Sequence, residues 1–328
     1  MLNTPQGAGN CTQMRLNIRK MKNEKWTTAD IPDLTGKVII VTGGNSGLGY
    51  ESVKAFAQNA AEVIMACRSV EKGEVARAEI MKNKPNGKIK IMPLDLMDLS
   101  SVRNFTDKFK ENYNRLDVLL NNAGIMIPPY GLTKDGFESQ IGTNHLGHFA
   151  LTGLLKDLIV KTPKSRVVST SSIAHKSGKM GFNNFMFANG NGYTPMKAYG
   201  RSKLANLLFI YELQRRFEAN NINSIAVAAH PGVSQTNLMR FIEGKFYYRL
   251  LKPLSSLFLQ SAAMGALPQL RAAVDPNVQG GDYYGPNGFN EMKGSPVKVK
   301  SIPASYNTED AKQLWKLSEK LTDINYNF

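Results

Sequence analysis

The sequence predicts an α/β fold in which a doubly wound parallel sheet is covered by helices on both faces. Short apolar runs alternate with amphipathic stretches from residue 34 to residue 322, which is typical of parallel sheets. The first run, Val38 to Val41, is rich in β-branched residues and ends at a turn of small residues, as expected of a strand buried on both faces. No internal repeat and no linker divides this region, so one domain is expected.

The expected elements follow from the position of each apolar run and each turn. Strands are predicted at 37–42, 62–67, 88–93, 116–121, 166–170 and 224–230, with a late one near 281–284. Helices are predicted at about 47–59, 70–82, 100–112, 136–160, 198–219 and 308–321. Right-handed crossovers then place the carboxyl ends of all these strands along one edge of the sheet. We expect the ligand site at that edge.

The predicted domain, 34–322, is preceded by a flexible basic leader, 1–33, and followed by a short tail, 323–328. Substrate-side loops are expected at about 173–197 and 234–270. Within the second loop, 250–267 is apolar but is interrupted by Lys252 and Pro253, so it does not predict a membrane-spanning helix. It is interpreted as a mobile amphipathic segment that either packs over the sheet or acts as a lid over an apolar substrate.

The formal net charge of +15 raises the question of an anionic partner. Part of the excess lies in the leader, and the rest is scattered among acids without a basic stripe interleaved with aromatic residues. We therefore expect no nucleic-acid partner, and prefer a basic surface that attracts a phosphate-bearing ligand.

Location and metal content are predicted from cysteine usage and from apolar runs. The two cysteines indicate a reducing compartment, and no metal site is expected. No apolar signal segment and no transmembrane segment is found in the sequence, so a cytoplasmic protein is expected. Weak peripheral contact with a membrane, through the leader and 250–267, is an alternative.

Glycines after the first predicted strand form the turn expected to hold a phosphate group. Their G-x-x-x-G-x-G spacing lets the backbone turn tightly and approach a pyrophosphate. The free N–H groups and the positive end of the helix that follows favour negative charge there. A tight turn without a ligand is the structural alternative. The residues expected to contact a dinucleotide are Gly43, Asn45, Ser46, Gly47, Leu48 and Gly49.

The second strand predicts which dinucleotide is bound. Its end usually carries an acid for the ribose 2′-hydroxyl, but here it carries Arg68, whose guanidinium suits a 2′-phosphate. NADP(H) is therefore expected in preference to NAD(H), although Arg68 could instead be a surface residue. Asp95 either accepts a hydrogen bond from the adenine amino group or caps the next helix. The further expected contacts, at the ends of the third and fourth strands, are Asp95, Leu96, Asn122, Ala123 and Gly124.

A tyrosine and a lysine four residues apart are the strongest catalytic signal. Tyr199 and Lys203 lie on one face of a predicted helix, and an ammonium group near a phenol lowers its pKa from about 10. Upstream, a buried strand ends in a cluster of hydroxyls, of which one can polarise a substrate carbonyl. Ser172 is our choice and Ser171 the second candidate. Taken alone, such a Tyr and Lys pair is usually an ordinary exposed pair.

In combination these motifs resemble the short-chain dehydrogenase/reductase family, over about residues 34–321. The resemblance rests on the glycine turn, on Asn121–Gly124, on Ser172 with Tyr199 and Lys203, on Asn144, and on His230-Pro231-Gly232 followed by Thr236. Shorter motifs, such as 66–68 and 144–149, resemble the retinol-dehydrogenase-like branch. That branch includes the WW-domain oxidoreductases and is akin to light-dependent protochlorophyllide reductases.

The resemblance implies a single-domain Rossmann fold and a catalytic tetrad. Tyr199 would be the general acid/base, Lys203 would lower its pKa and hold the nicotinamide ribose, Ser172 would polarise the carbonyl, and Asn144 would anchor a water in the proton relay. Pro231 and Val233 would support the nicotinamide by backbone contacts, with Thr236 near its carboxamide. A homo-oligomer is also implied.

The function expected from these residues is NADP-dependent interconversion of an alcohol and a carbonyl on a small, lipophilic or otherwise undetermined substrate. A non-catalytic dinucleotide-binding redox sensor or scaffold is the alternative, and the complete tetrad argues against it. The segment between Ser172 and Tyr199 is longer than in compact members of the family. Its Gly, Asn, Phe and Met content suggests a flexible cover on the substrate side.

Overall fold

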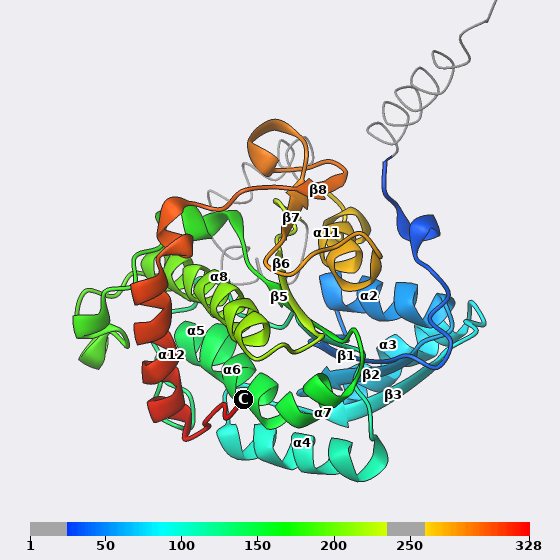
Figure 1. Cartoon of the computed structure of the whole chain (residues 1–328), viewed down its shortest axis with the longest axis horizontal. Coiled ribbons are helices and arrows are strands. Elements are labelled where there is room, and N and C mark those ends of the chain that lie inside the picture. The colour runs from blue at the N-terminus through cyan, green and yellow to red at the C-terminus, as the bar shows by residue number, and fades with distance from the viewer. Residues whose placement is uncertain (1–24, 235–259) are drawn as a thin grey trace, which may run out of the picture.

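The computed structural model describes residues 25–234 and 260–328, and contains one eight-stranded sheet (Figure 1). The strand order is β3-β2-β1-β4-β5-β6-β7-β8, and every neighbouring pair is parallel except β7 with β8. The order reverses direction between β1 and β4, which is where ligands bind in doubly wound sheets. The strands are β1 (Val38–Thr42), β2 (Glu62–Cys67), β3 (Lys88–Pro93), β4 (Val118–Asn121), β5 (Arg166–Thr170), β6 (Ile225–Ala229), β7 (Tyr283–Pro286) and β8 (Pro296–Lys298).

Helices cover both faces of the sheet (Figure 1). The helices on one face are α2 (Gly47–Gln58), α3 (Val70–Met81) and α11 (Ala262–Val274). Those on the other are α4 (Leu99–Asn112), α6 (Gly147–Leu154), α7 (Lys156–Lys161) and α8 (Pro195–Ala219). Outside this second layer, α12 (Thr308–Thr322) packs against α8 and α6. The short helix α5 (Ser139–Ile141) precedes α6.

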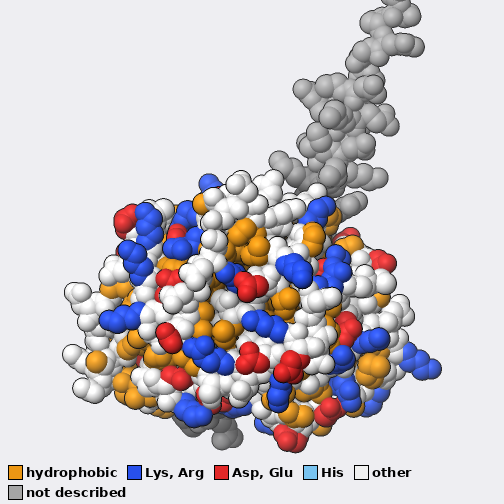
Figure 2. Space-filling view, turned by 60° about the horizontal axis from the view of Figure 1, so that its bottom comes forward, with side chains coloured by type: hydrophobic (Ala, Val, Ile, Leu, Met, Phe, Trp, Pro, Cys, Tyr) orange, Lys and Arg blue, Asp and Glu red, His pale blue; other side chains and the backbone are white. Residues whose placement is uncertain are grey.

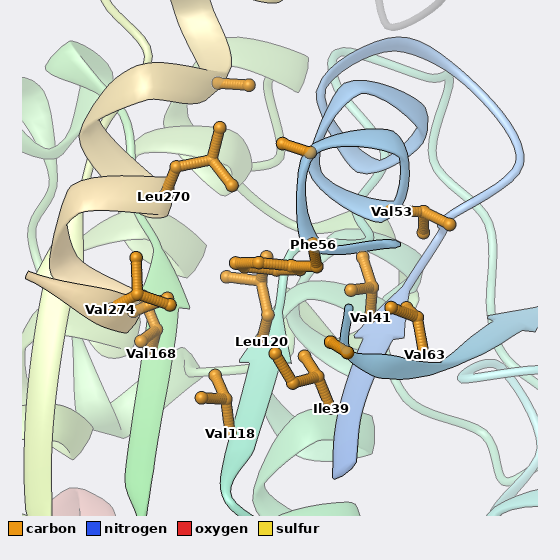
Figure 3. Packing of buried hydrophobic residues seen from close by; sticks show 14 of the residues in the cluster. Ile39, Val41, Val53, Phe56, Val63, Val118, Leu120, Val168, Leu270 and Val274 are labelled. Atoms are coloured by element: carbon orange, nitrogen blue, oxygen red, sulfur yellow. The ribbon is translucent and has the colours of Figure 1, made fainter. Parts of the chain in front are cut away.

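The core of the first face is built around Phe56 of α2, which is fully buried (Figure 3). It lies among the β-branched and leucine side chains of the central strands, such as Ile39 and Leu120, and opposite Leu270 of α11. Burying such side chains stabilises the fold by roughly 1.5–3 kcal/mol each. This packing fixes α2 and α11 against the central strands, whose carboxyl ends carry the site residues.

The predicted elements agree closely with the structure. The bounds predicted for β2, β3 and β5 are those observed, and β1, β4 and β6 begin or end within two residues of the predicted bounds. The family of folds predicted, a doubly wound parallel α/β sheet, is confirmed. Strand β8 was not predicted, because it is a three-residue antiparallel edge strand that begins with Pro296.

The segment 250–267 differs from its interpretation as a mobile amphipathic stretch. Residues 250–259 lie outside the described residues, but 262–267 form the first half of α11. This helix packs on α2 and on strands β5 to β7, so the alternative of packing over the sheet is correct for this half. The helix was missed because Pro268 lies inside it, at a position where proline normally ends a helix.

Both ends of the described domain extend beyond the predicted boundaries. Residues 1–24 of the expected leader lie outside the described residues, whereas Trp26 and Ile31 are buried in the first core. At the other end, Ile324 and Tyr326 are buried against α6 and α12, and the Tyr326 hydroxyl donates to the Phe149 carbonyl at 2.5 Å. Trp26 and Ile31 of the expected leader and Ile324 and Tyr326 of the expected tail are therefore part of the packed domain.

Part of the loop 173–197, residues 179–187, packs against α8 in place of forming an open cover. Met180, Phe185 and Phe187 are buried, and the first two join a small third core with residues of α8. Arg201 of α8 donates hydrogen bonds to three backbone carbonyls of this loop. The apolar residues that suggested a cover are the loop's own core.

The predicted long helix over 136–160 is broken into pieces. A π-helix, Gly142–Leu146, lies between α5 and α6, and Leu155 interrupts the helix again before α7. Single π-turns often mark functional positions. This one carries Asn144.

Candidate active site

The glycine turn between β1 and α2 has the geometry of a phosphate cradle. Gly43 has φ +66°, a conformation that side chains disfavour, and a Cβ on Gly49 would lie 2.2 Å from the Gly43 carbonyl oxygen. Ser46, at the N-cap of α2, makes no side-chain capping hydrogen bond. The amide groups of the first turn of α2 are therefore left for a ligand, and their positive end favours an anion.

A cavity of about 800 Å³ opens at this turn. Its volume is of the size that cofactor sites occupy. Arg68 is exposed at its wall and, in the described part of the chain, forms no hydrogen bond or ion pair. Asp95 also lines it, with Oδ1 accepting from the amide of Met97 at 3.0 Å. The predicted residues that line the cavity are Gly43, Asn45, Ser46, Arg68, Asp95, Leu96, Ala123 and Gly124.

The two roles considered for Asp95 are distinguished by hydrogen bonds, and Asn122 also has a hydrogen-bond partner. The cap of α4 is Asp98, not Asp95, because Asp98 accepts from the amides of the first turn. Asn122 donates from Nδ2 to the Thr42 carbonyl at 2.8 Å, so it joins the carboxyl ends of the neighbouring strands β1 and β4. The Asp95 carboxylate thus retains an oxygen without a hydrogen bond from the described residues, while Asn122 has a structural contact.

Tyr199 and Lys203 are both buried on α8, at the carboxyl edge of the sheet. Nζ of Lys203 lies 5.7 Å from the centre of the Tyr199 ring and donates to the Thr170 carbonyl at 3.0 Å. Burial lowers the pKa of Lys203 to about 8. Burial also raises the pKa of Tyr199 to about 12, and a hydrogen bond with the Ser172 side chain acts in the opposite direction. In this chain by itself, Lys203 does not bring the pKa of Tyr199 below its ordinary value.

The two candidate serines have different hydrogen-bond partners. Ser171 donates to the Lys203 carbonyl at 2.9 Å and is buried, so it fastens β5 to α8. Ser172 is half-buried and caps the following 3-10 helix, where its Oγ accepts from the amide of Ala174 at 3.2 Å. Ser171 thus has a structural contact, and Ser172 remains the chosen candidate.

Asn144 uses its side chain to join two elements. Oδ1 accepts from the amide of Ile125 at 2.8 Å, while Nδ2 donates to the Ile125 carbonyl at 3.0 Å and to Ser202 Oγ at 2.9 Å. Both protons of Nδ2 are thus used between the end of β4 and α8, while Oδ1 accepts one hydrogen bond from the described residues.

The backbone groups of Pro231 and Val233, after β6, already have hydrogen-bond partners within the chain. The Val233 amide donates to the Met292 carbonyl at 2.7 Å, and its carbonyl accepts from the Gln260 amide at 3.0 Å. The Pro231 carbonyl accepts from Ser234 Oγ and from Gln260 Nε2. Backbone support of a nicotinamide by Val233 would require an exchange of these partners. Thr236 lies outside the described residues.

Two buried residues of the site were not predicted. Gln269 of α11 donates to Ser52 Oγ at 2.9 Å and to Asn122 Oδ1 at 3.1 Å. His148 contacts Thr42 Oγ1 at 2.9 Å. The only sequence signal for His148 is its position four residues after Asn144, and Gln269 lay in a stretch assigned to a loop.

Surface charge and the described helices bear on possible partners. On the face shown in Figure 2, Lys and Arg side chains are interspersed with Asp and Glu side chains. No helix within residues 25–234 and 260–328 is long and apolar enough to cross a bilayer.

Residues 37–245 match the family model described as short chain dehydrogenase. The chain belongs to this family. It is 38% identical over 301 residues to human retinol dehydrogenase 11, covering 92% of this chain and 90% of that protein. It is also 38% identical to human WW domain-containing oxidoreductase, covering 88% of this chain and 69% of that protein.

A solved structure of an uncharacterized protein from Mycobacterium paratuberculosis is 40% identical to the chain. The match covers 93% of this chain and 100% of that chain, with a TM-score of 0.77. The expected membership in the short-chain dehydrogenase/reductase family is confirmed. The chain is an NAD(P)-dependent dehydrogenase acting on CH–OH groups.

Proposed function

We propose that this chain is an NADP-dependent oxidoreductase that interconverts an alcohol and a carbonyl on a small lipophilic substrate. The observation that carries the proposal is the burial of Tyr199 and Lys203 together on α8, where Nζ of Lys203 donates to the Thr170 carbonyl at the end of β5, two residues before Ser172. A carbonyl oxygen placed between the Tyr199 and Ser172 hydroxyls would receive two hydrogen bonds as charge develops on it. Relatives named retinol dehydrogenases support a lipophilic alcohol as the substrate class.

The roles of the four tetrad residues follow from their contacts. Because burial raises its pKa to about 12, Tyr199 keeps its proton near neutral pH and is suited to donate it to a carbonyl oxygen. Ser172 orients the same oxygen. Lys203, with a single acceptor among the described residues, would use its other protons to hold ribose hydroxyls, and Asn144 fixes α8 to the end of β4. The dinucleotide, when bound, supplies or accepts the hydride.

The preference for NADP(H) rests on Arg68. Its guanidinium is exposed at the cavity wall, and Lys72 of α3 lines the same cavity. Two cations beside the adenosine end favour a 2′-phosphate over a hydroxyl. We expect Arg68→Asp to reduce the NADPH-to-NADH affinity ratio by roughly 10- to 100-fold.

The matched control for Arg68 is Arg77→Asp. Arg77 lies on α3, the helix that follows Arg68; its partner is Glu74, and it does not line the cavity. Titration by nicotinamide fluorescence measures both ratios. An unchanged ratio in Arg68→Asp would refute the role of Arg68.

The catalytic proposal is tested by Tyr199→Phe. We expect kcat for carbonyl reduction to fall by about 10²- to 10⁴-fold, because the ring is kept and only the transferable proton is lost. Tyr211→Phe is the control, since Tyr211 is also buried on α8 but bonds to Ser301. Full activity of Tyr199→Phe would overturn the mechanism. Tight NADPH binding by the wild type without turnover of any carbonyl would instead favour a redox sensor.

The cytoplasmic location and the homo-oligomeric state expected from the sequence remain predictions. Sedimentation of the purified chain measures the oligomeric state. Flotation with anionic liposomes tests the weak membrane contact that the basic N-terminal segment suggested.

A further inference from the structure

His148 connects two parts of the site through its two ring nitrogens. It lies in α6, four residues after Asn144, and only 3% of its surface is exposed. Nδ1 is 3.1 Å from the Asn144 carbonyl oxygen, and Nε2 is 2.9 Å from Thr42 Oγ1. Thr42 ends β1 at the phosphate cradle, while Asn144 belongs to the π-helix beside α8.

These contacts fix the direction of each hydrogen bond. A carbonyl can only accept, so Nδ1 of His148 carries the proton. Burial lowers the pKa of His148 to about 4, and the neutral ring therefore accepts at Nε2. The Thr42 hydroxyl is the donor to Nε2, because the alternative acceptor, the Leu120 carbonyl, lies at 3.4 Å.

The chain of hydrogen bonds continues on the far side of Thr42. Oγ1 of Thr42 accepts from the amides of Asn122 and Ala123, each at 2.9 Å. Ala123 lines the cavity at the phosphate cradle. Each group in this chain therefore donates to the next: the amides after β4 donate to Thr42, Thr42 donates to His148, and His148 donates to the Asn144 carbonyl. Rotation of either the threonine or the histidine would leave a buried polar atom without a partner, which costs about 1–3 kcal/mol.

We propose that His148 is a positioning residue that couples the dinucleotide cradle to the proton-transfer residues. Its Nε2 end orients Thr42, and with it the backbone of Asn122 and Ala123 at the cavity. Its Nδ1 end fixes the Asn144 carbonyl, next to the side chain that binds Ser202 of α8. The inference about proton transfer rests on the proposed function, whereas the inference about the cradle concerns binding alone.

Two conservative variants test the contributions of Nδ1 and Nε2 separately. In His148→Asn the side-chain amide replaces Nδ1 and can donate to the Asn144 carbonyl, but it is too short to reach Thr42. In His148→Gln the amide oxygen replaces Nε2 and can accept from Thr42, but no donor stands at the Nδ1 position. We expect a crossed result, in which the order of the two variants in NADPH affinity is the reverse of their order in kcat. The Gln variant binds NADPH about tenfold more tightly than the Asn variant, and the Asn variant has about tenfold higher kcat.

His145→Leu is the control for a merely structural effect. His145 is 1% exposed and lies in the π-helix that precedes α6, but its Nε2 bonds to Ser318 of α12, away from the cavity. We expect a loss of thermal stability without a crossed change in affinity and kcat. Thr42→Val is the second approach, because it breaks the chain without changing the histidine. It should weaken NADPH binding like His148→Asn, and the two effects should not add.

The outcomes distinguish this inference from the proposed function. Equal NADPH affinities of the Asn and Gln variants, or additive effects with Thr42→Val, would overturn the coupling at the cradle. Equal kcat values of the two variants would overturn the coupling to proton transfer. If the wild type turns over no carbonyl, the proposed function fails, and the order of the two NADPH affinities still decides whether His148 orients Thr42.

Discussion

Replacing Arg201 by methionine should release the loop 179–187 from α8. The Arg201 side chain is 3% exposed and donates from Nε to the Lys179 carbonyl at 3.0 Å, and from Nη1 to the carbonyls of Asn184 and Phe185 at 2.7 Å each. Its guanidinium also lies 4.0 Å from the centre of the Phe187 ring. A methionine fills a similar length but donates no hydrogen bond, so three carbonyls lose their donor.

The expected cost follows from these contacts. A hydrogen bond to a charged group contributes roughly 1.5–3 kcal/mol, so three would give roughly 4.5–9 kcal/mol. Burial of the guanidinium, which lowers the pKa of Arg201, offsets part of this gain. We expect a net loss of about 3 kcal/mol in the free energy that keeps the loop closed. This corresponds to a roughly 150-fold larger open population.

Trypsin cleavage measures this population directly. The side chain of Lys179 is exposed, and the bond that trypsin would cut carries the carbonyl that Arg201 holds. Where cleavage follows the open population, the rate at Lys179–Met180, read by mass spectrometry, should rise about 150-fold in Arg201→Met. Arg216→Met is the control, since Arg216 stacks on Trp315 at 4.1 Å from the same helix but is partly exposed. Equal cleavage rates in the two variants would refute the reasoning.

Two further predictions concern charge and packing. Since burial lowers the pKa of Lys203 to about 8, the unfolded chain holds this proton more tightly, and charged Lys203 costs stability below that pH. The free energy of unfolding of the wild type, relative to Lys203→Met, should therefore rise by about 2 kcal/mol from about pH 7 to about pH 9.5 in urea titrations, and a flat difference would contradict this. Tyr326→Ala should lower the free energy of unfolding by about 3–5 kcal/mol, because the ring is buried against Trp315. Phe328→Ala, at a ring that is 36% exposed, should cost under about 1.5 kcal/mol, and equal losses would contradict the packing of the C-terminal segment.

Strands whose limits are set by neighbouring residues in the sequence could be predicted. The β-branched runs of β2, β3 and β5 are bounded by turn residues, so their limits could be read from the sequence. Helix α11 could not be predicted, because Pro268 is tolerated only through the packing of this helix on α2 and the sheet. Strand β8 could not be predicted either, since its pairing with β7 is a tertiary contact of three residues.

The same distinction applies to the site. Tyr199 and Lys203 were predicted because four residues on one helix set their relation. The contact of Thr42 with His148 joins residues 106 positions apart, and it exists only because β1 and α6 meet at the carboxyl edge. The roles of Ser171 and Ser172 likewise depended on which of the two faces α8, a question of strand register that the sequence left open.

Burial without a counter-charge explains the titration of both central residues. Desolvation is the largest cause that raises the pKa of Tyr199 to about 12 and that lowers the pKa of Lys203 to about 8. The Lys203 ammonium has one acceptor in the described chain, the Thr170 carbonyl, so its charged form is poorly stabilised. A ligand that places hydroxyl or phosphate oxygens beside Lys203 would raise the pKa of the lysine. The retained ammonium would then lower the pKa of Tyr199, so ligand binding itself would bring the phenol closer to the range in which it can exchange a proton.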